Sequence, residues 1–137
     1  MFEEALAITV YIPFDSQPDL SALDLPSLSA VCQTLPKVID LLERSRPIGC
    51  LGHYAAAYEL SIGLEGFTPL EGANPTQGEI GQRESVPTLC FKTYAPGGIA
   101  QEKVEAFLHA LISIHPWEHP AIELHRAQLV RGPADAT

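Results

Sequence analysis

The order of apolar patterns along the chain is the feature that most restricts its fold. Short alternating or β-branched runs predict strands, whereas apolar residues three or four positions apart predict helices. The predicted strands are residues 6–12, 53–66, 86–95 and 121–130, and the predicted helices are residues 28–42 and 99–114. Strand, helix, strand, strand, helix, strand is the split βαβ order of an α+β, ferredoxin-like domain. We therefore expect one antiparallel sheet with both helices on one face.

Proline and the terminal residues refine this prediction. Pro36 lacks an amide hydrogen and clashes with the preceding turn, so we expect the first helix to kink or split near Leu35. In the last strand we expect Ile122 and Leu124 to face the interior. Residues from about 131 to 137 are predicted to fray, because nothing in their sequence ties them down.

Charge and length restrict the class of protein. The chain has 137 residues, which suits one domain over residues 1–137, and a formal net charge of −9. An acidic surface repels phosphate backbones and anionic lipid, so we expect neither nucleic acid nor a membrane surface as a partner. No apolar stretch approaches the ~18 residues of a membrane span. The acidic, β-branched start does not resemble a secretory signal.

The cysteines indicate a reducing environment. Cys32, Cys50 and Cys90 are odd in number and too far apart for a CxxC metal or redox motif. We interpret them as reduced thiols that pack as small apolar side chains. The chain is therefore expected to be cytoplasmic.

A first unusual segment, Leu64–Pro75, reads LEGFTPLEGANP. Its glycines permit positive backbone torsions and its prolines fix their own, so the segment should hold one shape. Glu71 and Asn74 can accept hydrogen bonds from neighbouring backbone amides. Two interpretations remain open: a rigid structural crossing between strands, or a loop that contacts a ligand or partner.

A second unusual segment, His115–Leu124, reads HPWEHPAIEL and follows the predicted second helix. His115 and Glu118 flank Pro116 just beyond the helix end, where the helix dipole stabilises a cationic histidine. One interpretation is a helix stop in which both side chains bond to nearby backbone. The other is that His115 and Glu118 contribute to a ligand or metal site.

Several side chains in these segments could bind a metal ion, which is the basis of a second hypothesis. His115 and His119 have a spacing that suits metal binding on a helix, although Pro116 prevents a helix across it. The other candidate ligands are Glu118, His125, His53 and Cys50. A divalent transition metal is the only cofactor considered. No nucleophile elbow, P-loop or dinucleotide motif is present, so we predict a protein that is not an enzyme.

Three motifs in this order resemble those of the YqfO family, a small domain that also occurs as an insert within larger dinuclear-metal proteins of the NGG-interacting-factor-like family. The matching residues are Gly49, Gly52, Tyr54, Gly63, Phe67, Pro69, Leu70, Glu71, Gly72, Asn74, Pro75, Gly78, His115, Pro116, Glu118, Pro120 and Ala121, with Trp117 at the aromatic position. The resemblance covers about residues 48–125. It implies a fold like that of CutA and PII signalling proteins. Such units commonly assemble through sheet edges, so it also implies a homo-oligomer, either a trimer or a dimer.

The chain departs from the family pattern in two places. Residues 55–57 are alanines where the family carries polar residues, and His53 stands where the family has asparagine. The segment Phe14–Ser29 is longer than the pattern requires. The dinuclear metal site of the larger proteins lies in a domain outside the resemblance.

The sequence thus predicts a small, oligomeric, non-enzymatic binding or regulatory module that binds a protein partner or a small ligand. The predicted contacting residues are Glu71, Asn74, His115 and Glu118. The alternative is a divalent transition-metal-binding protein like CutA relatives, which would use His115, His119 and His53.

Overall fold

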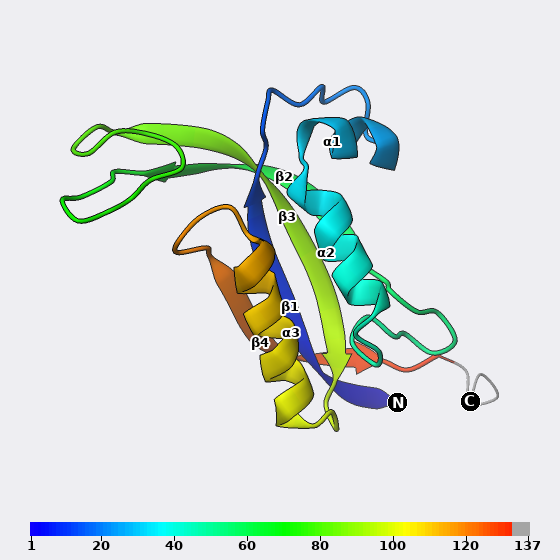
Figure 1. Cartoon of the computed structure of the whole chain (residues 1–137). Helices are drawn as coiled ribbons and strands as arrows, with labels where there is room; N and C mark the ends of the chain where they lie inside the picture. Colours follow the sequence, from blue (N-terminus) through cyan, green and yellow to red (C-terminus); the bar gives the residue numbers. More distant parts are fainter. Residues whose placement is uncertain (133–137) are drawn as a thin grey trace.

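A computed structural model describes residues 1–132 and shows the predicted arrangement (Figure 1). The elements are β1 (Phe2–Pro13), α1 (Leu25–Val31), α2 (Thr34–Glu43), β2 (Glu59–Phe67), β3 (Glu84–Pro96), α3 (Gln101–Ile114) and β4 (Ile122–Val130). The strands form one sheet in the order β2-β3-β1-β4, and every neighbouring pair is antiparallel. The α+β, ferredoxin-like prediction is confirmed.

The core lies between the sheet and the helices α2 and α3, which cover the same face of the sheet in Figure 1. Strand register aligns the largest apolar side chains: Val10 lies opposite Phe91, and Ile12 lies opposite Leu89. Each such fully buried side chain contributes about 1.5–3 kcal/mol. Tyr58 stacks on Phe91 with ring centroids 4.8 Å apart and extends this core toward β2.

The predicted split of the first helix is confirmed, but its position differs. The break falls between α1 and α2 at Cys32 and Gln33, before Leu35. Pro36 lies in the first turn of α2, where amide groups have no intrahelical acceptor, so proline fits there without breaking a bond. Upstream, the Asp24 carboxylate accepts a hydrogen bond from the Ser27 amide over 2.9 Å and fixes the start of α1.

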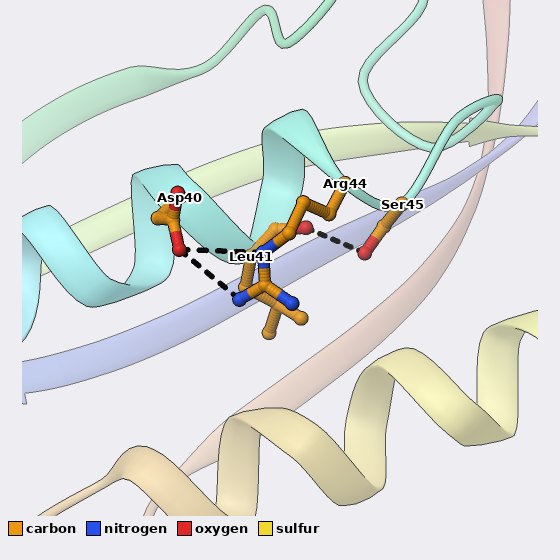
Figure 2. Close-up of polar contacts among 4 residues, drawn as sticks. All are labelled: Asp40, Leu41, Arg44 and Ser45. Carbon is orange, nitrogen blue, oxygen red and sulfur yellow. Dashed lines mark hydrogen bonds and ion pairs between the residues drawn. The ribbon is translucent and has the colours of Figure 1, made fainter.

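Polar contacts mark the carboxyl end of α2 (Figure 2). The Arg44 guanidinium lies 3.2 Å from the Asp40 carboxylate, and the Ser45 hydroxyl donates to the Leu41 carbonyl over 2.6 Å. Both charged side chains are largely exposed, so the ion pair contributes less than about 1 kcal/mol. The serine adds a second hydrogen bond to the Leu41 carbonyl, which also accepts from the Arg44 amide at the end of the helix.

Strand β2 begins six residues later than the prediction from His53. Leu51 and Tyr54 instead exchange two backbone hydrogen bonds of 2.8 and 3.0 Å across a tight turn. Gly52, at the first corner of this turn, has a φ of +58°. The apparent alternation from residue 54 onward therefore begins in a loop, and the strand starts only at Glu59.

Strand β4 is also less buried than its pattern indicates. Ile122 packs against the core as predicted, but Leu124 is 45% exposed although it lies opposite Ile8. The reason is that β4 is an edge strand and has a neighbour on one side only. At its end the Arg131 amide donates to the Met1 carbonyl over 2.7 Å. The rest of the predicted frayed tail, residues 133–137, lies outside the described residues.

Segment Phe14–Ser29 runs from β1 into α1 and lies beside the other edge of the sheet. Its side chains Leu20 and Leu23 share a groove with Leu60 and Ile62 of β2. Both leucines remain mostly exposed. The segment therefore lies along the β2 side of the core without enclosing it.

Candidate binding cleft

The two unusual sequence segments meet in the structure. In Figure 1 the ribbon formed by β2 and β3 extends past the rest of the sheet, and the turn after α3 lies next to it. The Asn74 amide donates to Glu118 Oε1 over 2.8 Å. The Thr76 hydroxyl donates to the Pro116 carbonyl over 2.9 Å. Segments 40 or more residues apart are thus joined by two hydrogen bonds.

Between these segments lies a cleft of about 280 Å³. It is lined by Glu65, Phe67, Thr68, Pro69, Asn74, Pro75, Thr76, Gln77, Trp117, Glu118 and His119. Phe67 and Trp117 meet edge to face with ring centroids 5.4 Å apart. Such an aromatic pair is worth about 0.5–1.5 kcal/mol beyond its buried area, so it helps to fix the two segments relative to each other.

Backbone hydrogen bonds within the loop between β2 and β3 also fix its shape. The Gly81 amide donates to the Pro69 carbonyl over 2.7 Å, and the Ala73 amide donates to the Leu70 carbonyl over 3.0 Å. Gly72 has a φ of +97°, a conformation that favours glycine. The wall of the cleft is therefore a loop of defined shape, as its glycines and prolines predict.

His115 caps α3 as a buried, neutral imidazole. Its Nδ1 accepts from the Trp117 amide over 3.0 Å, so Nε2 carries the proton and donates to the Tyr11 carbonyl over 2.7 Å. Burial lowers the pKa of His115 below its usual value, and the bond to Tyr11 opposes this only in part. Desolvation of this 8% exposed side chain therefore favours the neutral imidazole over the cationic form that a helix dipole would stabilise, and His115 bonds to nearby backbone as the helix-stop interpretation expects.

The predicted ligand-contacting residues separate into two groups. Asn74 and Glu118 line the cleft, whereas His115 is buried, does not line it, and accepts from the amide of the lining residue Trp117. Glu71 is exposed at the tip of the loop and is not a lining residue. Sequence analysis did not propose Glu65, although it lies in the segment Leu64–Pro75, nor Gln77, which carries no local signal of its own.

The predicted metal-binding histidines are not brought together. His119 lines the cleft, whereas both nitrogens of His115 are engaged by protein groups. His53 borders a separate hollow near Ala5, toward the other end of β1 from the Tyr11 carbonyl that His115 contacts, and Cys50 borders it too. Within residues 1–132 no group of three or more His, Cys, Asp or Glu side chains is placed to hold a metal ion.

The remaining candidate, His125, is engaged on the sheet face opposite the helices. Its Nε2 lies 2.9 Å from Glu123 Oε2, while the Tyr11 hydroxyl donates to Glu123 Oε1 over 2.5 Å. This hydrogen bond is the main cause that raises the pKa of Tyr11 to about 12, and the negative charge of Glu65 adds to it. Partial burial raises the pKa of Glu65 itself.

No known family model matches the chain. A Bacillus subtilis (strain 168) protein named "GTP cyclohydrolase 1 type 2 homolog" is 32% identical over 77 residues, which is 56% of this chain. The matched part is 20% of that protein, so the chain spans about a fifth of the length of this curated relative.

Solved structures define the class of fold. A Bacillus cereus protein related to NIF3 superimposes with a TM-score of 0.62 at 20% identity, covering 93% of this chain and 26% of that one. The periplasmic divalent cation tolerance protein CutA from Archaeoglobus fulgidus gives a TM-score of 0.53 at 11% identity, covering 96% and 89%. The chain therefore has a CutA-like α+β fold. None of the helices in residues 1–132 has the length and apolar character needed to cross a membrane.

Proposed function

We propose that this protein is a non-enzymatic binding or regulatory module of the CutA/PII-like group, related to the YqfO family, and that it acts as a homo-oligomer. Its binding site is the cleft between the loop at residues 68–77 and the turn at residues 115–119. One observation carries the proposal: two distant segments are tied together by the bonds from Asn74 and Thr76 and frame a cleft between them. The similarity to a CutA structure and to a NIF3-related structure supports it.

The titratable groups favour binding over catalysis. Burial raises the pKa of the Cys32 thiol to about 11, so it is not an activated nucleophile. His115 already uses both ring nitrogens. One oxygen of Glu118 accepts from the Asn74 amide. His115 and Glu118 hold the cleft in shape, whereas Cys32 lies in the core, and none of the three is poised to transfer a proton.

Exposed edges support assembly into oligomers. β2 and β4 are the two edges of the sheet, and each presents unpaired backbone groups on one side. Leu64 on β2 is 73% exposed. The three cysteines are free thiols, which suits the reducing cytoplasm.

Native mass spectrometry of untagged protein, purified without chelator, tests this proposal together with NMR titration of a neutral and charged fragment library. We expect an oligomer, and fragments that shift the amide signals of residues 65–77 and 117–119. Trp117→Ala should abolish those shifts. Tyr54→Ala, which removes an exposed aromatic outside the cleft lining, should not. A library in which no fragment moves the cleft signals would contradict the binding role.

A further inference from the structure

The cleft offers acceptors for hydrogen bonds and negative charge. Glu65 and Glu118 supply two carboxylates, and none of the eleven lining residues is lysine or arginine. The Asn74 amide occupies only one oxygen of Glu118. His119 is the one basic side chain among the lining residues, so the two carboxylates outnumber it and favour a cation over an anion.

Gln77 adds an unsatisfied acceptor. Its side chain lines the cleft, and its Oε1 is buried without a hydrogen-bond partner among the described residues. A buried carbonyl left in this state is unfavourable, so its presence beside a cleft needs an explanation. The oxygen is closed off from solvent as it is placed, and a turn of the Gln77 side chain toward the cleft would let it accept from a ligand that carries N–H donors.

Aromatic rings complete the pattern. Phe67 and Trp117 lie in the lining, and their edge-to-face contact leaves ring surface available to the cleft. Aromatic faces attract ammonium and guanidinium groups, and tryptophan does so most strongly. The cleft volume of about 280 Å³ is below that of most drug-sized ligand sites, which span roughly 300–1,000 Å³.

We propose that the cleft recognises a primary ammonium or guanidinium group on a short alkyl chain. This chemistry is common to free amines and to the lysine or arginine side chain of a peptide. The inference rests on the proposed function, because it names the ligand class of the same cleft. An organic cation fits better than a divalent metal, because the described residues provide no set of three metal-ligating side chains.

Fluorescence gives a direct readout, because Trp117 is the only tryptophan in the chain. We would titrate butylammonium chloride at constant ionic strength, with 1-butanol as a neutral probe of similar shape. Butylammonium should change the Trp117 emission and saturate, and 1-butanol should bind at least about fivefold more weakly.

Matched variants locate the charge effect. Glu65→Gln and Glu118→Gln keep the shape of each side chain, and the latter keeps an oxygen for the Asn74 amide. Each should weaken butylammonium binding about fivefold and leave 1-butanol binding unchanged. Glu59→Gln makes the same charge change on β2 outside the cleft lining and should leave both unchanged.

The outcomes separate the two proposals. The cation inference is overturned if butylammonium and 1-butanol bind with equal affinity and neither the Glu65 nor the Glu118 variant changes that affinity. The cleft would then still be a binding site. If neither probe binds, the cation inference fails, and the fragment titration decides whether the binding role fails with it. Tighter binding of spermidine than of an acetylated Gly-Lys-Gly amide supports a free amine, and the reverse supports a peptide side chain.

Discussion

At the scale of single residues, Gly49 shows how one backbone position can require glycine. Its φ is +84°, and an added Cβ would lie 2.9 Å from Leu42 Cδ1 and 3.2 Å from the Ala56 Cα. Gly49 also joins the loop to the sheet, because its amide donates to the Tyr94 carbonyl over 2.8 Å. The residue therefore combines a left-handed conformation with close packing against the core.

We predict that Gly49→Ala lowers the free energy of unfolding by about 2–4 kcal/mol, through left-handed strain and displacement of Leu42. Gly52→Ala is the matched control: its φ is +58°, but nothing lies within 4 Å of an added Cβ. This control should cost only the strain of about 1–2 kcal/mol. Urea unfolding of both variants checks the difference, and equal losses would show that contact with Leu42 has no effect.

His115 makes stability depend on pH. Its pKa in the folded state lies below the usual 6.5, so the unfolded chain takes up a proton more readily. The stability that neutral His115 contributes is fully present above about pH 6.5 and is lost as pH falls toward the folded-state pKa. Near neutral pH, His115→Gln should cost about 1–3 kcal/mol, because buried hydrogen bonds are lost.

The measurement is the difference in unfolding free energy between wild type and His115→Gln, taken near neutral pH and at about pH 5.5. We expect this difference to shrink at the lower pH. His109→Gln, an exposed position on α3, serves as the control and should differ little from wild type at either pH. A difference that grows in acid would mean that a cationic His115 stabilises the helix end.

At the scale of secondary-structure elements, the junction between the β2–β3 loop and the turn after α3 depends on few bonds. The Thr76 hydroxyl supplies one of the two hydrogen bonds that cross it. Thr76→Val removes this bond with little change in shape. We expect faster amide hydrogen exchange in residues 68–82 by about fivefold, the effect of about 1 kcal/mol.

Thr68→Val is the control for that experiment, because Thr68 also lines the cleft but takes no part in the two hydrogen bonds that join the segments. Exchange in residues 68–82 should stay near the wild-type rate in this variant. If both variants exchange alike, the bond to Pro116 does not hold the loop. The core strands should be unaffected in either case.

Local patterns predicted the elements better than they predicted their ends or their contacts. Apolar spacing located α3 and the core strands, because their burial follows the helix and strand periods directly. It placed the helix break at Leu35, since Pro36 alone does not show whether it starts or interrupts a helix. The start of β2 was missed because residues 54–58 alternate by chance inside a loop.

Predicting the cleft would have required information that no local sequence pattern carries. The motifs containing Asn74 and Glu118 attracted attention separately, but only the folded chain shows that they bond to each other. Nothing in the sequence distinguishes Glu65 within the segment Leu64–Pro75, and Gln77 lies outside that segment, because the role of each follows from which wall of the cleft it reaches. Conversely, Glu71 belongs to the same motif as Asn74 but is exposed and does not line the cleft.

At the scale of the whole molecule, the helices cover one sheet face, and the β2–β3 ribbon extends from the body (Figure 1). An exposed edge strand with large apolar side chains is a site of pairing with another chain. Leu64 on β2 and Leu70 just beyond it are both more than 70% exposed. If the protein is a homo-oligomer, this edge is the surface that assembly should cover.

We predict that Leu64→Lys shifts the protein from an oligomer to the 14.8 kDa chain. A lysine at this edge adds charge and removes apolar area that an interface would bury. Ile112→Lys places the same charge on α3, at a half-exposed apolar position, and should leave the assembly intact. Light scattering coupled to size-exclusion chromatography measures the mass. A wild-type protein that elutes as a 14.8 kDa monomer would remove the oligomer from the proposed function.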